Sequence, residues 1–400
     1  MQTVYQAVRI SEHVYWVGAI DWNVRDFHGY ATKSGTTYNA FLVMGDKPTL
    51  IDTVRKQFSD EMFSRIASII DPGQIRYIVS NHSEPDHSGS LSLAIDRIQP
   101  ERIYASKMGK KALGEIFHVD GVTAVADGET VSLGDATLTF LETKMLHWPD
   151  SMFTYLAEDK LLFSQDAFGM HVATAERFAD QLDDSLLEYE GGRYYANILW
   201  PYSHLILKLI DRVKSLDLAI DIVAPDHGPV WRKDYGRIID LYARWASPEP
   251  DRKALIVYDT MWKNTERMAL AIAEGMQRQD IPYKVMSLSG NHRSDIAYEL
   301  LQAGALFVGS PTLNNNVFPT VIDVLTYLKG LKPRNLVGAA FGSYGWSGES
   351  VGQVEAILRE MKVGLVSEGI KARNAPDDEV IARCLSLGEA VKKTWGEMQS

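Results

Sequence analysis

The sequence predicts an α/β protein of two domains, and three observations point to it. The chain has 400 residues, which is more than a single hydrophobic core usually serves. The stretch 247–253 concentrates prolines and charged residues, as a linker does. After this stretch, strand-like and helix-like segments alternate regularly. We therefore expect one domain over residues 1–250 and a second over residues 251–400.

The first domain mixes strands and helices. Short apolar runs predict strands at 49–53, 75–80, 161–164 and 219–224. The last three runs lead directly into polar segments that contain histidine or aspartate. Functional residues favour such positions, where a rigid strand meets a loop.

The second domain alternates more regularly. Strand-like runs lie at 254–258, 283–286, 305–308 and 336–340. Helix-like stretches such as 265–277 lie between them. This βαβα order predicts a doubly wound parallel sheet.

Composition excludes several classes of protein and partner. The net charge is −11 and there is no basic tail, which disfavours nucleic acid as a partner. No apolar run reaches the length of a membrane span, and Met1–Tyr5 does not resemble the start of a signal peptide. Cys384 is the only cysteine, so the chain cannot form an internal disulfide or an iron–sulfur site. We expect a cytoplasmic protein.

The strongest motif is the segment 81–89, Asn-His-Ser-Glu-Pro-Asp-His-Ser-Gly. Pro85 disfavours helical backbone at Glu84, so alternate side chains of this loop can point to two different metals. With three later residues, the candidate metal ligands are His82, Glu84, Asp86, His87, His147, Asp166 and His227. Imidazole and carboxylate without thiolate suit iron or manganese, and zinc stays open.

These seven residues, in this order and spacing, resemble the metallo-β-lactamase fold in its flavodiiron form. The resemblance runs from Trp16 to the last helix and implies an αββα sandwich for the N-terminal domain. It implies two irons per chain, one held by His82, Glu84 and His147 and the other by Asp86, His87 and His227, with Asp166 as the bridge. In some members the histidine matching His87 turns away from the iron, so its role stays open.

Three loops after strands of the second domain, at 259–265, 309–316 and 341–349, predict an FMN site. Hydroxyl groups and backbone N–H groups at a helix N-terminus suit a phosphate. The glycines at 342, 345 and 348 do not have the dinucleotide-binding spacing. Tyr344 or Trp346 could flank the flavin ring. The expected contacts are Thr260, Met261, Trp262, Asn264, Thr265, Pro311, Thr312, Asn314, Asn315, Ser343, Tyr344, Gly345 and Trp346.

Three further residues are candidates for catalysis near the metals. In similar proteins a histidine or tyrosine from segments like 26–30, 171 and 194–195 approaches the diiron pocket. Such a group could donate a proton to a reduced oxygen species. We name His28, His171 and Tyr195, and for each an ordinary structural role is the alternative.

The resemblance implies a flavodiiron oxygen reductase or nitric oxide reductase. FMN would accept electrons from a carrier such as rubredoxin and pass them to the diiron site, which reduces O2 to water or NO to N2O. The resemblance also implies a head-to-tail homodimer, or a homotetramer, in which FMN of one chain lies near the diiron site of another.

Two functions from other classes compete with this interpretation. The first is a zinc hydrolase of the same fold, such as a thioesterase. Glu84 speaks against it, because the hydrolases usually carry histidine there. The second is an electron carrier with structural metals, against which the carboxylate-rich ligand set speaks, because structural sites favour cysteine.

Overall fold

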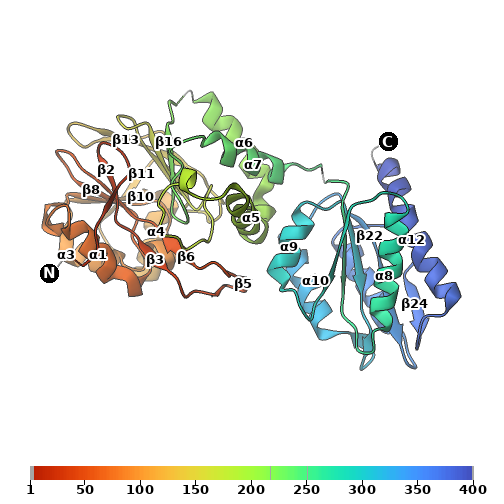
Figure 1. Ribbon diagram of the computed structural model, residues 1–400. Helices are drawn as coiled ribbons and strands as arrows, with labels where there is room; N and C mark the ends of the chain where they lie inside the picture. Colours follow the sequence, from red (N-terminus) through yellow and green to blue (C-terminus); the bar gives the residue numbers. More distant parts are fainter. Residues whose placement is uncertain (1–3, 217, 250, 399–400) are drawn as a thin grey trace. The chain divides into compact units, whose positions relative to one another are not determined.

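Figure 1 shows a computed structural model of the chain, which describes residues 4–216, 218–249 and 251–398. The chain separates into two compact units. The first comprises Met1–Tyr195 and Tyr202–Ala246, and the second comprises Ala196–Pro201 and Ser247–Ser400. Pro250, the end of the predicted first domain, lies outside the described residues. That boundary therefore stays a prediction.

The first unit contains two large β-sheets. One has the order β1-β2-β7-β8-β9-β10-β11, formed by Val8–Arg9, Val14–Trp16, Phe41–Val43, Thr49–Ile51, Tyr77–Ser80, Arg102–Ser106 and Val122–Val125. Its strands from β8 to β11 are parallel. The other has the order β12 to β16, formed by Thr130–Ser132, Thr137–Glu142, Met152–Leu156, Leu161–Gln165 and Ile222–Pro225. Its neighbours are antiparallel until β15 meets β16 in parallel.

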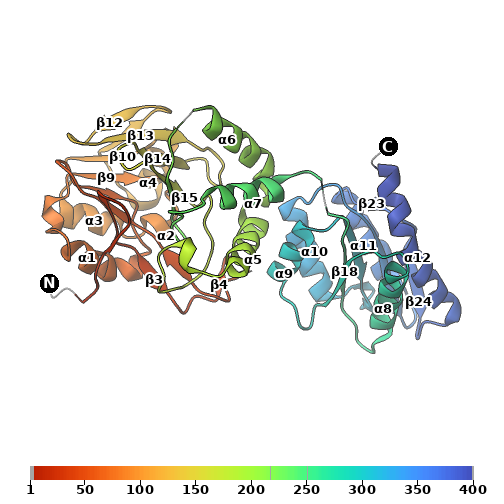
Figure 2. The same cartoon turned by 45° about the horizontal axis from the view of Figure 1, so that its top comes forward.

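These sheets pack face to face between helices, which confirms the predicted αββα sandwich (Figure 2). Phe41 and Phe163, one from each sheet, lie in the core between them with ring centroids 5.3 Å apart. Helices α1 (Ser59–Ala67), α3 (Leu91–Ile98) and α4 (Lys107–Phe117) cover the first sheet. Helices α6 (Ser203–Ser215) and α7 (Gly236–Ala246) lie against the second.

The remaining elements of this part of the chain are the helix α5 and several short strands and turns. They are β3 (Ala19–Asp21), β4 (Asp26–Phe27), β5 (Tyr30–Ala31), β6 (Thr36–Tyr38), α2 (Pro85–Ser88), α5 (Asp184–Tyr194), the 3-10 turns Lys56–Phe58, Pro72–Gln74, Ala179–Gln181 and Trp200–Tyr202, and the π-helix Tyr195–Leu199. Of the four predicted strands, three correspond closely to β8, β9 and β15. The fourth, β16, begins three residues later than predicted, at Ile222. The backbone N–H groups of Asp221 and Ile222 both bond to Lys160 O, so the chain reaches the sheet only there.

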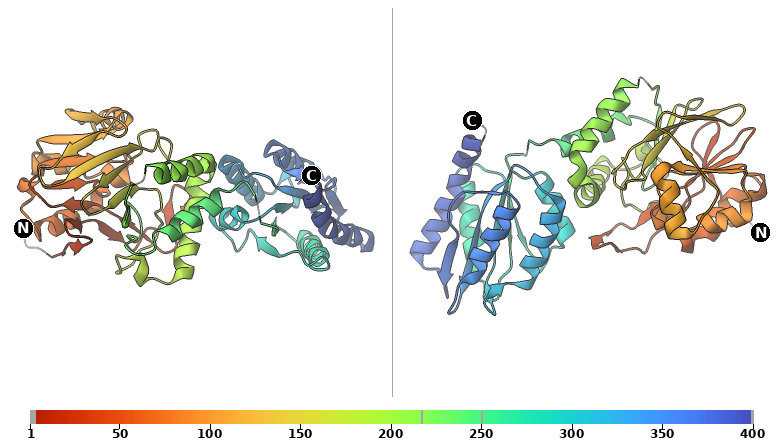
Figure 3. Two further views of the ribbon diagram at one scale, coloured as in Figure 1. Left: turned by 90° about the horizontal axis from the view of Figure 1, so that it is seen from above. Right: turned by 180° about the vertical axis from the view of Figure 1, so that it is seen from behind.

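The second unit is a parallel sheet with helices on both faces, as predicted (Figure 3). Its order is β18-β17-β19-β22-β23, with β24 also on β22, formed by Tyr283–Ser287, Ala254–Tyr258, Ala305–Gly309, Val337–Tyr344, Gly364–Leu365 and Ile370–Arg373. A hairpin of β20 (Thr312–Leu313) and β21 (Asn316–Val317) follows β19. This strand order is flavodoxin-like.

Alternate side chains of β17 explain the two helical layers. Ile256 packs with α8 (Asn264–Gln277) and α12 (Asp378–Met398), and Leu255 packs with the other layer. That layer is formed by α9 (Arg293–Leu301), α10 (Pro319–Leu331) and α11 (Glu349–Glu360). Cys384 of α12 is fully buried in the first of these two cores. Among the described residues, no helix is long and apolar enough to cross a membrane.

Candidate metal centre and cofactor pocket

The loop after β9 begins the metal centre. Glu84 has extended backbone (φ −61°, ψ 141°) and caps α2, whose first residue is Pro85. His82 and Glu84 therefore precede the helical turn, while Asp86 and His87 lie within it. This change of backbone conformation sends the two pairs of side chains to different places, in consecutive pairs rather than in the predicted alternation.

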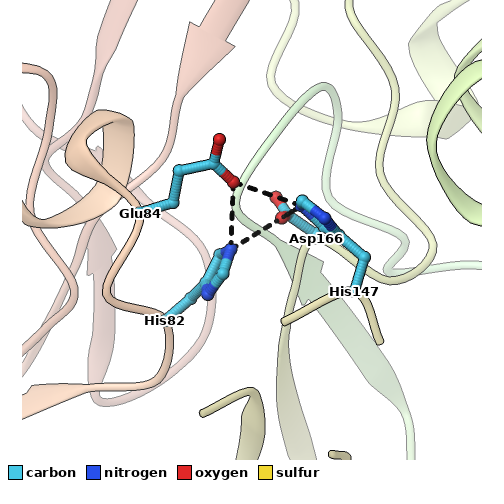
Figure 4. A group of neighbouring side chains, drawn as sticks. All are labelled: His82, Glu84, His147 and Asp166. Carbon is cyan, nitrogen blue, oxygen red and sulfur yellow. Dashed lines mark hydrogen bonds and ion pairs between the residues drawn. The ribbon is translucent and has the colours of Figure 1, made fainter. Parts of the chain in front are cut away.

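A first group of donors gathers around one oxygen of Asp166 (Figure 4). His147 Nε2 lies 2.9 Å from Asp166 Oδ2 and 3.2 Å from Glu84 Oε2. His82 Nε2 lies 3.3 Å from the same two oxygens. Four side chains from three separate segments thus point to one small volume.

A second group faces the other oxygen of the same carboxylate. His87 Nε2 lies 3.1 Å from Asp166 Oδ1, and His227 Nε2 lies 3.5 Å from it. Asp86 Oδ2 lies 3.2 Å from His227 Nε2 and 3.4 Å from His87 Nε2. All seven predicted ligands are therefore brought together, in two sets that share Asp166.

The protein alone leaves these donors unsatisfied. Asp86 Oδ1, His87 Nε2 and Asp166 Oδ1 are buried and have no hydrogen-bond partner within the described ranges. Buried polar groups without partners are costly, and three carboxylates in one buried place are more so. Two divalent cations would satisfy both requirements, and imidazole with carboxylate is a donor set that iron accepts. The residues fit the implied metal pair.

The electrostatics of the centre also favour cations. Burial lowers the pKa of His147, but hydrogen bonds to Asp166 and Glu84 outweigh it and raise that pKa to about 9. Burial raises the pKa of Asp166, yet the charge of His87 and the other imidazoles hold it well below its usual range. Carboxylates that stabilise protonated imidazoles equally favour a metal ion, which displaces the protons.

Outer residues orient the ligand rings. His82 Nδ1 lies 3.3 Å from Asp150 Oδ2, and His227 Nδ1 lies 2.6 Å from Thr37 O. Such contacts fix which ring nitrogen faces the metal. Nothing in the local sequence marks Thr37, because its partner is distant along the chain. Asp150 follows a predicted ligand by three residues, which is a weak signal at most.

His28 lies near Glu84 of the first donor group, and His171 lies near His227 of the second. His28 sits in the β4–β5 hairpin, is 76% exposed, and places Nε2 3.5 Å from Glu84 Oε1. His171 is fully buried, and its Nδ1 lies 2.8 Å from Thr36 Oγ1. Its ring centroid lies 4.6 Å from that of His227. Burial and the nearby His227 charge hold the pKa of His171 well below its usual range.

Tyr195 is placed differently from the prediction. Its hydroxyl lies 2.9 Å from Ser203 Oγ, and its ring packs on Tyr242. The preceding residue, Tyr194, packs against the site, with its ring centroid 5.0 Å from that of His171 and 6.0 Å from that of His227. Adjacent residues of a helix point about 100° apart, so the sequence alone does not choose between the two tyrosines.

The predicted FMN loops meet at the carboxyl ends of β17, β19 and β22. A pocket there is lined by Met261, Trp262, Asn264, Pro311, Ser343, Tyr344, Gly345 and Asn374. The indoles of Trp262 and Trp346 are each 84% exposed. An open pocket flanked by exposed aromatic residues at the strand ends suits a flat flavin.

The other predicted contacts lie in the same loops but outside this lining: Thr260, Thr265, Thr312, Asn314, Asn315 and Trp346. The side chains of three of them form hydrogen bonds within the protein. Thr265 Oγ1 lies 3.0 Å from Ser343 Oγ, Thr312 Oγ1 lies 2.8 Å from Ser350 Oγ, and Asn315 donates to Glu349. Asn374 was not predicted, because it follows β24, a strand with no clear apolar run.

Comparisons with known sequences agree with this arrangement. Residues 36–228 match the ODP family beta lactamases, and residues 256–387 match flavodoxin. A nitric oxide reductase of Moorella thermoacetica is 45% identical over 391 residues, covering 96% of this chain and 98% of the relative. A rubredoxin-oxygen oxidoreductase of Megalodesulfovibrio gigas is 44% identical over 376 residues, covering 93% and 94%.

Solved structures give the same result. The rubredoxin oxygen:oxidoreductase from Desulfovibrio gigas superposes with a TM-score of 0.96 at 41% identity, covering 99% of this chain and 100% of the other. The flavodiiron protein from Giardia intestinalis superposes with a TM-score of 0.92 at 33% identity, covering 98% and 97%.

The position of Asp166 predicts a specific pattern of metal loss. Asp166→Ala should lose tight binding of both ions, because its two oxygens face both donor sets. Glu84→Ala should lose only one, because the set around Asp166 Oδ1 stays intact. Element-resolved metal analysis of the purified variants measures this, with the surface variant Asp221→Ala as the control. Two tightly bound ions in Asp166→Ala would contradict the bridging position.

Proposed function

This chain belongs to the flavodiiron protein family, and from that premise we infer that it is an oxidoreductase that reduces O2 to water or NO to N2O. Its electrons come from a protein donor through FMN and a diiron site. The observation that carries this inference is the division of Asp166, one oxygen to each donor set. A shared carboxylate holds two metals close enough for both to contact one diatomic substrate.

Under this proposal, the ligand sets follow the two groups of donors. His82, Glu84 and His147 bind one iron, and Asp86, His87 and His227 bind the other, with Asp166 between them. When bound, FMN supplies electrons and the iron pair delivers them to the gas. The support for these roles is the convergence of all seven side chains and their unsatisfied buried atoms.

The chain's own residues bury the second donor group more completely than the first. Around His171, the rings of Phe27, Tyr30 and Tyr194 lie within 5.4 Å centroid to centroid and exclude water. At the first donor group, the side chain of His147 is 17% exposed and that of His28 is largely exposed. We therefore propose that the gas enters beside His28, and that this imidazole supplies a proton to the reduced substrate. For His171 we propose that its uncharged imidazole orients the ring of His227 by packing against it.

Several finer assignments rest on the family. The relative named rubredoxin-oxygen oxidoreductase supports rubredoxin, or a similar carrier, as the donor.

We propose a head-to-tail homodimer, or a homotetramer of such dimers, that brings FMN of one chain to the diiron site of another. Full specific activity in protein proven to be monomeric would contradict it. We also propose a cytoplasmic location, which suits a chain with one buried thiol.

The zinc hydrolase and the electron carrier are set aside. Relatives that cover nearly the whole chain carry the names of oxygen and nitric oxide reductases. Both names denote enzymes of redox chemistry rather than hydrolases or simple carriers.

The function is tested by metal content and gas consumption together. Protein purified without added metal should contain two iron ions per chain, one for each donor set. With reduced rubredoxin, it should consume O2 or NO when either gas is added alone to a degassed reaction cell. Glu84→Ala should keep its FMN and lose at least about a hundredfold in turnover, since removing a metal ligand disables the pair. Two zinc ions and rapid thioester hydrolysis would contradict the proposal.

The exposed indoles predict where FMN is held. Trp262→Ala and Trp346→Ala should each weaken FMN binding, because a stacked aromatic pair contributes about 0.5–1.5 kcal/mol, up to roughly tenfold in affinity. Titrating the FMN-free protein with FMN and following flavin fluorescence measures the change. Trp22→Ala, which removes an exposed indole of the first unit, is the control. Unchanged affinity in both loop variants would place the flavin elsewhere.

A further inference from the structure

We propose that Asp226 is a positioning residue that holds His87 among the ligands of the second iron. The inference rests on the proposed function, because it concerns the diiron site. It addresses the one ligand whose role the family resemblance leaves open. The evidence lies in the contacts on the two sides of the His87 ring.

The backbone of His87 is fixed, so its ring nitrogens decide its orientation. His87 O accepts hydrogen bonds from Thr53 N at 2.8 Å and Thr53 Oγ1 at 2.7 Å. His87 N donates to Glu84 O at 2.9 Å. The ring then reaches from Asp166 Oδ1, 3.1 Å from Nε2, to Asp226 Oδ2, 3.5 Å from Nδ1. What faces Nδ1 therefore helps to determine whether Nε2 faces the metal.

Asp226 has no other side-chain partner in the described part of the chain. It is fully buried, and neither carboxylate oxygen accepts a hydrogen bond. Its backbone is held at both groups, because N donates to Gln165 O at 2.8 Å and O accepts from Asn39 N at 2.7 Å. If the His87 ring turned away, the buried carboxyl group of Asp226 would lose its contact with Nδ1, and a buried polar group without a partner is costly. The pair is therefore mutually dependent.

Asp150 shows the contrast. It faces His82 Nδ1 at 3.3 Å, but its Oδ2 also accepts from Ser83 N at 2.6 Å and Ser83 Oγ at 2.5 Å. Oδ2 of Asp150 is thus satisfied without the histidine, whereas neither oxygen of Asp226 accepts a hydrogen bond. This difference predicts that loss of the outer carboxylate affects the ring position more at His87 than at His82.

The experiment compares Asp226→Leu with His87→Ala, singly and together, in the iron-loaded holoprotein. Iron affinity, by competition with a chelator, and the Mössbauer spectrum are the measurements, and circular dichroism checks folding. Asp226→Leu should weaken binding of the second iron at least about tenfold, as loss of an outer partner does elsewhere. Its spectrum should approach that of His87→Ala. In the His87→Ala background, Asp226→Leu should change neither quantity, because the contact acts only through His87.

Two further variants keep the test decisive. Asp226→Asn preserves volume and one acceptor, and should give a smaller loss of affinity with the same dependence on His87. It carries the test if Asp226→Leu does not fold. Asp150→Leu is the matched control, because it acts on the other iron and its effect should persist in the His87→Ala background.

Wild-type affinity and spectrum in a folded Asp226→Leu protein would overturn the inference. So would an equal loss with and without His87, which would indicate a general structural role. If the wild-type protein binds two irons, either of these results for the variants leaves the proposed function intact. A wild-type protein that does not bind two irons would overturn the proposed function itself.

Discussion

The carboxylate of Asp166 lies between two groups of imidazoles, and the metal centre depends on that position. Each of its oxygens faces one group, at 2.9 Å from His147 Nε2 and 3.1 Å from His87 Nε2. Asp166 is held there by its neighbour, since its N–H donates to Gln165 Oε1 at 2.7 Å while Gln165 Nε2 donates to Leu146 O at 2.5 Å. The bridge and the His147 loop are thereby tied to each other through one glutamine.

The sandwich supplies the rigidity that this arrangement needs. Predicted ligands follow directly after three strands, β9, β15 and β16. The residues of these strands are almost completely buried. Sequence segments far apart therefore reach one place with little freedom, which reduces the entropy lost when metals bind. The second unit positions its FMN loops in the same way, because these loops also follow the ends of buried strands.

Local patterns made much of this predictable. Of the seven donor side chains, four lie within six residues of the sequence, and Asp166 and His227 lie just after strands. His147 lies in a loop away from any strand, and it was predicted from the family resemblance. The regular alternation after residue 253 was enough for the doubly wound sheet. Residues that act through contacts between distant parts of the sequence could not be predicted. They are Thr37, which contacts His227, Asp226, which contacts His87, and Asn374, which lies beside the FMN loops. The choice of Tyr194 over Tyr195 needed the rotation of α5, which no residue pattern fixes.

The burial of Cys384 has a consequence for the chemical durability of the chain. Partly reduced oxygen oxidises thiolates most readily, and nitric oxide nitrosates them when an oxidant such as O2 accepts the released electron. The thiol of Cys384 is buried in a core between helices and sheet, and this burial raises its pKa to about 12. Almost none of it is ionised at neutral pH, and reagents cannot reach it. An enzyme that handles such gases thus offers them no reactive sulfhydryl of its own.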